Sequence, residues 1–181
     1  MDPASIFLIA AQKENFLHLT GVSSHRRKGD FFDACLNGSV CKSDFNFEGK
    51  RRSARENRGN ARRKLNSFPR LRHLFSSDLL IEQNYVKNSI SCSLAASEGR
   101  ITIGFTGKIL LAPMTLLKGN HLHNPQAVSF VLRKKNGEEK FNELIYGDEN
   151  CLPSSLRILG YNVSEDLIET IWNEEVHHSE F

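Results

Sequence analysis

Alternation of apolar and polar positions predicts β-structure in the second half of this chain. The stretches 90–94 and 101–106 alternate apolar residues with serine, threonine or glycine, the two-residue period of a half-buried strand. Asn136-Gly137 between two such stretches is a strong hairpin signal. In all, five stretches predict strands: 79–86, 90–94, 101–106, 128–132 and 141–146. Because the connections between them are short, such as 97–100, we expect an antiparallel sheet.

The first half predicts helices and one short strand. Asp30 is a suitable N-cap for a helix that ends at Leu36, with Gly38 just beyond it. Residues 48–67 predict a polar helix, and Pro69 opens a second short one. As a strand, 15–21 would place His18 and Thr20 on the face opposite two leucines, with Gly21 ending it.

Near the end of the chain, 153–159 predicts a short helix, and Ser164 caps a longer one with an apolar stripe. The fold class is therefore α+β, with N-terminal helices packed on an antiparallel sheet of about four to five strands and a C-terminal helix. With 181 residues we expect one domain. Its parts are a mainly helical region, 1–76, with a basic segment at 50–73; the sheet, 77–146; and a C-terminal helical region, 147–181.

Composition is that of an ordinary globular protein, at 39% hydrophobic and 25% charged residues. The four cysteines form no CxxC pair and no zinc-like spacing, so we expect reduced thiols. The first residues lack the basic start of a secretory signal, and no stretch is long and apolar enough to span a membrane. We therefore expect a cytoplasmic protein with no membrane partner.

Positive charge is gathered in one segment. Residues 50–73 hold ten lysines and arginines and one acidic residue, a formal charge of +9, so the rest of the chain carries −6 against a total of +3. Such segregation is typical of a surface that binds a polyanion such as RNA, although a solvated helix face is the plainer alternative. The residues predicted to bind nucleic acid are Arg51, Arg52, Arg55, Arg58, Arg62, Arg63 and Lys64.

Histidines are the candidates for acid–base chemistry, since an unperturbed imidazole titrates near pH ~6.5. His18 lies just before a glycine and is either catalytic or a structural histidine hydrogen-bonded under a loop. His121 and His123 form an HxH pair, but no acid or cysteine completes a metal site, so a polar loop is the better interpretation. We expect no metal and no cofactor. Ser129 and Arg133 share one strand face that can either hold a phosphate or simply face solvent.

Four features together resemble the phage and mobile-element branch of the Barnase–EndoU–colicin–RelE ribonuclease superfamily. They are the FLHLTG stretch (16–21), FFDACL (31–36), the basic RRKL run (62–65) and the hairpin strands that follow. The resemblance covers about residues 15–146 and implies metal-independent RNA cleavage by attack of the ribose 2′-OH, often in toxin-like or host-interfering proteins. It implies His18 as acid or base, with Thr20 in the same motif, and a hydroxyl such as Ser129 on a late strand as a hydrogen-bond donor. We add the hypothesis that Lys118 or Arg133 is the cationic clamp.

Two other functions remain open on the sequence. The basic arm suits a non-catalytic module that binds nucleic acid, and equally an inhibitor that docks on an acidic protein. The expected partner is RNA, with a protein inhibitor or host protein as a further possibility.

Overall fold

The computed structural model describes residues 6–48, 53–76, 78–147 and 163–164. The chain divides into two compact units. The main unit comprises Ile6–Leu74 and Leu80–Gln126, and the hairpin unit comprises Phe75–Leu79 and Ala127–Phe181 with Met1–Ser5. Each is described by itself below. The predicted C-terminal helices lie outside the described residues, apart from Val163 and Ser164.

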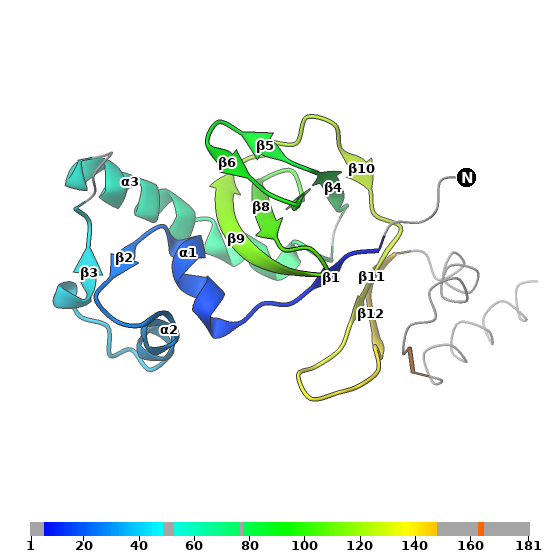
Figure 1. Ribbon diagram of the computed structural model, residues 1–181, viewed down its shortest axis with the longest axis horizontal. Helices are drawn as coiled ribbons and strands as arrows, with labels where there is room; N and C mark the ends of the chain where they lie inside the picture. Colours follow the sequence, from blue (N-terminus) through cyan, green and yellow to red (C-terminus); the bar gives the residue numbers. More distant parts are fainter. Residues whose placement is uncertain (1–5, 49–52, 77, 148–162, 165–181) are drawn as a thin grey trace, which may run out of the picture. The chain divides into compact units, whose positions relative to one another are not determined.

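The main unit is built on a curled, mostly antiparallel sheet (Figure 1). Its strands follow the order β1-β9-β8-β7-β4-β10. Their bounds are β1 (Leu8–Ile9), β9 (Leu110–Lys118), β8 (Ile101–Thr106), β7 (Leu94–Ser97), β4 (Leu80–Gln83) and β10 (Gln126–Ala127). The prediction of an α+β fold with an antiparallel sheet is confirmed, except that β1 pairs with β9 in parallel.

The two central strands are buried at nearly every position, on both faces. All four residues of β7 and the first five of β8 are buried. The polar ones have internal partners: Ser97 Oγ donates to the Ile101 carbonyl at 2.7 Å, and Thr102 Oγ1 donates to the Gly119 carbonyl at 2.8 Å. Thr102 and Gly104 therefore lie on a second buried face of β8 rather than on a solvent-facing side, and the Thr102 hydroxyl is satisfied within the protein.

The longest strand, β9, was not predicted. Its sequence, LLAPMTLLK, lacks regular alternation and contains Pro113, which has no backbone N–H to donate to a sheet. Pro113 pairs with Phe105 at a register shift between Gly104 and Phe105. Such an irregularity is where a central strand accommodates a proline.

Residues 15–21 are helical, so the strand predicted there is wrong. Helix α1 (Phe16–Thr20) buries Leu17 and Thr20, which are three residues apart, and ends at Gly21, whose φ is 72°. Thr20 Oγ1 donates to the Leu17 carbonyl at 2.7 Å, a bond that helical backbone allows. Over five residues the apolar pattern fits both the period of a helix and that of a strand. Gly21 adopts the left-handed backbone that commonly ends a helix, and this agrees with the helical structure.

Two further helices flank α1. Helix α2 (Lys28–Leu36) ends near Gly38, as predicted, but begins earlier, with Arg27 rather than Asp30 at its N-cap. Helix α3 (Ala54–Leu65) is shorter than the predicted 48–67, because Ser53 and Glu56 form a capping box that sets its start. Pro69 opens the 3-10 helix η3 (Phe68–His73), as predicted.

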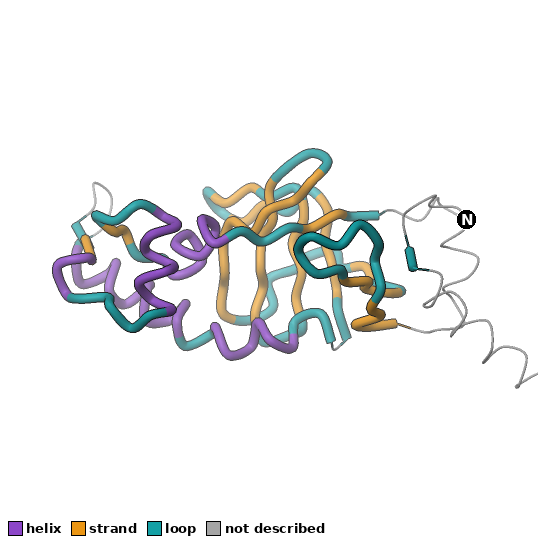
Figure 2. Tube along the Cα trace, turned by 90° about the horizontal axis from the view of Figure 1, so that it is seen from below, coloured by secondary structure: helices purple, strands orange, loops and turns teal. Residues whose placement is uncertain are grey.

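Aromatic rings hold the helices together. Phe16 of α1 lies 6.2 Å from Phe31 and 5.3 Å from Phe32 of α2, between ring centroids, and 5.5 Å from Phe68 of η3. In Figure 2 the helices gather beside the strands rather than between them. Both α1 and α3 contact β9, so the helices lie on the β9 side of the sheet.

Short pairs complete the main unit. The strand β2 (Ser23–Ser24), which precedes α2, pairs with β3 (Phe45–Asn46), which follows the 3-10 helix η2 (Lys42–Asp44). Arg26 Nε donates to Asp44 Oδ1 at 2.7 Å, and this bond, with one from the Cys41 backbone, lowers the pKa of Asp44 to about 2.

The predicted strand 90–94 is split between β6 (Ile90–Ser91), which pairs with β5 (Val86–Lys87), and the start of β7. A short 3-10 helix, η1 (Lys13–Asn15), precedes α1.

The hairpin unit contains the predicted hairpin at Asn136-Gly137. Strands β11 (Phe130–Arg133) and β12 (Glu143–Gly147) pair antiparallel around it.

None of the helices among the described residues is long and apolar enough to cross a membrane.

Gly104 tests the packing of the central sheet. A Cβ added there would lie 2.4 Å from Cys92 Sγ and 3.0 Å from Thr115 Cγ2. We predict that Gly104→Ala lowers the free energy of unfolding by about 1–3 kcal/mol in urea titrations, and that adding Cys92→Ala recovers part of the loss. Gly59→Ala is the matched control: that Cβ meets nothing within 4 Å and replaces a helical glycine, so it should raise stability by up to ~1 kcal/mol. An unchanged midpoint for Gly104→Ala would contradict this packing.

Candidate active site around His18

His18 sits on the exposed side of α1 and contacts a lysine from α2. The distance from His18 Nε2 to Lys28 Nζ is 2.9 Å. An ammonium group only donates hydrogen bonds, so Nε2 is the acceptor and the neutral ring carries its proton on Nδ1. Two helices thus place an imidazole and a cation side by side.

A second lysine reaches the same region from α3. Lys64 is half-buried, one turn after the buried Ala61, and its Nζ lies 3.5 Å from Thr115 Oγ1 of β9. Its stem passes over Gly21: a Cβ there would lie 2.7 Å from Lys64 Cδ. The positive φ and this close approach both require glycine directly after α1.

These surroundings lower the pKa of His18 below its ordinary value. Partial burial is the largest cause, followed by the positive charges of Lys28 and Lys64. Each of these disfavours the imidazolium form, so His18 is neutral at neutral pH. A neutral imidazole in contact with the Lys28 ammonium group, and under the charge of Lys64, can take a proton from a hydroxyl while the lysines bind a phosphate.

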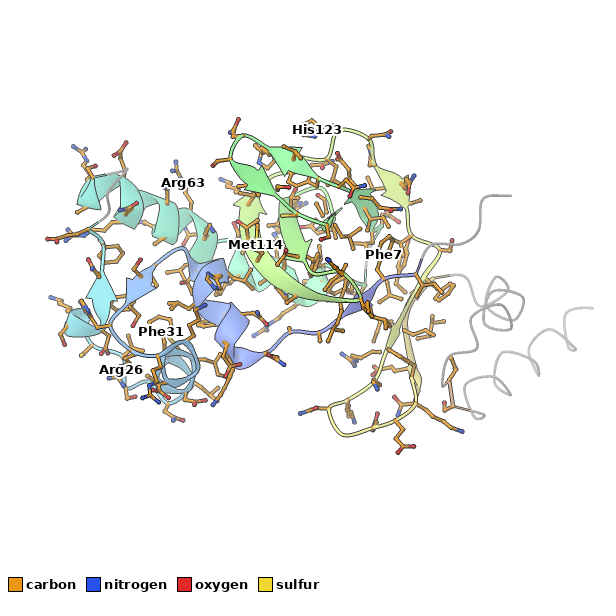
Figure 3. The ribbon with its side chains drawn as sticks, in the orientation of Figure 1. Phe7, Arg26, Phe31, Arg63, Met114 and His123 are labelled. Atoms are coloured by element: carbon orange, nitrogen blue, oxygen red, sulfur yellow. The ribbon has the colours of Figure 1, made fainter. Side chains whose placement is uncertain are left out.

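The predicted basic stripe is present on the outer side of α3. Arg55, Arg58 and Arg62 are exposed, and among the described residues none of them forms an ion pair with a carboxylate. Glu56 turns back to the helix start, where Ser53 N and Oγ each donate to its carboxylate at 2.8 Å. Figure 3 labels Arg63, which hydrogen-bonds Asn60 on the same helix. Arg51 and Arg52 lie outside the described residues.

Thr20 has a structural setting. Its side chain is 2% exposed; the hydroxyl donates to the Leu17 carbonyl and accepts from Val22 N at 3.2 Å. Both bonds fix the end of the helix that carries His18. Thr20 therefore supports the position of His18 rather than facing solvent.

Lys118 is the last residue of β9, and the two histidines of the HxH pair follow it in the chain without sharing a partner. The Lys118 carbonyl accepts from His121 Nε2 at 2.8 Å, and His121 Nδ1 contacts Lys87 Nζ. His123 Nδ1 lies 3.6 Å from Glu82 Oε1. The two histidines thus have different partners, and nowhere in the described part of the chain do three His, Cys, Asp or Glu side chains group as metal ligands.

Ser129 and Arg133 belong to the hairpin unit. Ser129 is exposed just before β11, and Arg133 Nε donates to Glu143 Oε2 at 2.7 Å. A second bond joins Arg133 Nη2 to Glu143 Oε1. Its charge is therefore offset by a carboxylate directly across the strand pair.

Two residues of the site were missed from the sequence. Lys28 lies before the helix start predicted at Asp30, although the basic run Arg26-Arg27-Lys28, which leads into α2, was an available signal. Thr115 lies in the strand that was not predicted. Neither sequence pattern nor spacing indicates that these residues meet His18 and Lys64.

Comparison with known families gives one match. A family model described as phage-Barnase-EndoU-ColicinE5/D-RelE like nuclease4 (PBECR4) matches residues 5–150. This range includes α1, α2, α3 and the whole sheet. No curated protein and no solved structure matches the chain.

The lowered pKa of His18 can be measured directly. In an NMR titration we predict a midpoint for His18 below the ordinary value of about 6.5. Lys28→Gln should raise that midpoint, but only part of the way, because burial and Lys64 remain. Lys42→Gln, an exposed lysine of η2 that is absent from the causes of the shift, should leave it unchanged. A midpoint at or above the ordinary value would contradict the described geometry.

Proposed function

The chain belongs to the phage-Barnase-EndoU-ColicinE5/D-RelE like nuclease family, and on that basis we propose that it is a metal-independent endoribonuclease. In this proposal the ribose 2′-OH attacks the adjacent phosphate and the 5′-oxygen leaves. The observation that carries it is the contact between the neutral His18 and Lys28, with the charge of Lys64 acting on the same imidazole.

His18 is the general base of the proposed reaction. Its Nε2 is the accepting nitrogen, so it can take the 2′-OH proton once Lys28 turns from the imidazole to the phosphate. Lys28 and Lys64 offset the negative charge that develops on the phosphate oxygens. One of these ammonium groups also protonates the leaving 5′-oxygen.

The cationic role goes to Lys28 and Lys64 in preference to Lys118 or Arg133. Both lysines act on His18, whereas Arg133 is paired with Glu143. A hydroxyl donor is supplied by Thr115, which contacts Lys64, rather than by Thr20, whose hydroxyl is engaged within α1, or by Ser129. RNA cleavage of this kind inside a cell would make the protein toxin-like or host-interfering.

The second candidate function is RNA binding without cleavage. The exposed stripe of Arg55, Arg58 and Arg62 favours it, because phosphate contacts by arginines need no catalytic group. RNA retained intact, with affinity that falls steeply as salt rises, is the result that this alternative predicts.

Substitution of His18 tests the catalytic proposal. His18→Ala should lower the rate of RNA cleavage in EDTA by about 10²–10⁴-fold, the usual contribution of a general acid–base residue. Cleavage by the parent should rise with pH through a value below about 6.5, as the lowered pKa of His18 requires.

His25→Ala is the matched control, since His25 is exposed on the loop before α2 and lies outside the site. It should cleave at the parental rate. Equal rates for His18→Ala and His25→Ala would show that His18 is not the base.

A further inference from the structure

A series of ring contacts leads from the core to the surface of α3. Phe31 of α2, labelled in Figure 3, is 2% exposed. Phe45 packs edge-on against it, with centroids 5.9 Å apart and planes at 85°. Phe47 stacks on Phe45 at 6.0 Å with planes at 11°, and the Arg58 guanidinium lies over the Phe47 ring, 5.4 Å from its centroid.

The rings of Phe45 and Phe47 and the guanidinium of Arg58 are fixed in position but remain accessible to solvent. The Phe47 carbonyl accepts from Asn57 Nδ2 at 2.7 Å, which ties the end of β3 to α3. Phe45 and Phe47 are only half-buried, and Arg58 is exposed. A planar cation over a half-exposed ring is a surface on which another flat, electron-rich ring can stack.

We propose that Phe47 and Arg58 form a subsite for an unpaired nucleobase of single-stranded RNA. The base stacks on the guanidinium, or replaces it on the Phe47 face, as bases do on aromatic and arginine planes in proteins that bind single strands. This inference rests on RNA being the substrate of the proposed reaction, and it adds that the RNA is unpaired near the cleaved bond.

The position along α3 suits such a strand. Arg58 and Lys64 are six residues apart, about 9 Å along the helix axis. A stacked strand rises about 3.4 Å per nucleotide, so the axial distance alone needs about three nucleotides, and the strand needs more because Arg58 and Lys64 lie on different faces of α3. Arg62 lies one turn beyond Arg58 on the same exposed stripe, where it can contact the phosphates next to the stacked base.

The experiment uses the full chain and short single-stranded 2′-O-methyl RNAs, which lack the attacking hydroxyl and cannot be cleaved. One RNA is intact, and the others each carry an abasic site at one position. Fluorescence anisotropy at fixed salt should give a Kd for the intact RNA about 5- to 100-fold lower than for the abasic RNA whose missing base belongs in the subsite.

Two substitutions locate the effect. Phe47→Leu, which keeps apolar volume, and Arg58→Lys, which keeps charge, should each remove most of the preference for the intact RNA. Arg55→Lys, on the same stripe but with no ring beneath it among the described residues, should retain the preference for the intact RNA. Equal binding of intact and abasic RNAs by the parent would overturn the subsite, as would a preference that survives both substitutions.

Because the probe cannot be cleaved, this result is separate from the proposed reaction. Cleavage of ordinary RNA together with equal binding of intact and abasic probes would overturn the subsite alone. A base preference in a protein that never cleaves RNA would support the subsite and overturn the proposed enzymatic function.

Discussion

The passage of Lys64 over Gly21 is the contact on which the candidate site depends. A lysine stem can cross the end of α1 only because residue 21 has no side chain, and the chain can turn there only because glycine tolerates a φ of 72°. The ammonium group then reaches Thr115 on β9. One side chain thus connects α1, α3 and the sheet, and it brings positive charge to His18.

This geometry gives α3 two functions on two faces. Asn57, Ala61 and Lys64 recur every three to four residues and face the rest of the main unit, where Asn57 bonds the end of β3 and Lys64 enters the site. Arg55, Arg58 and Arg62 form the exposed face. The helix tolerates so much positive charge because Glu56 completes its first turn and three basic residues, Arg62, Arg63 and Lys64, lie in its last turn, where the helix dipole favours cations.

Much of the fold was predictable because it depends on local patterns. Alternation identified the regions of β8 and β11, the Asn136-Gly137 turn signal identified the region of β12, and the stripe of arginines identified the outer face of α3, whereas the predicted strand 90–94 reached only the first residue of β7. Strand β9 was not predicted because it contains Pro113. The register shift beside Phe105 accommodates this proline, and such a shift between two strands cannot be recognised from the sequence of one strand. Residues 16–20 are too few to distinguish the period of a helix from that of a strand. His18 could be proposed from its place in the FLHLTG stretch just before a glycine, whereas Lys28 and Thr115 could not, because tertiary contacts bring them to the candidate site.

The chemical nature of the RNA ends shows whether the ribose 2′-OH, activated by a neutral His18 in contact with Lys28, is the attacking group. Phosphorus NMR of the products formed in EDTA distinguishes the possibilities. We expect 2′,3′-cyclic phosphate ends paired with free 5′-hydroxyl ends. Products with 5′-phosphate and 3′-hydroxyl ends, or cleavage of DNA at a rate comparable to that of RNA, would contradict it.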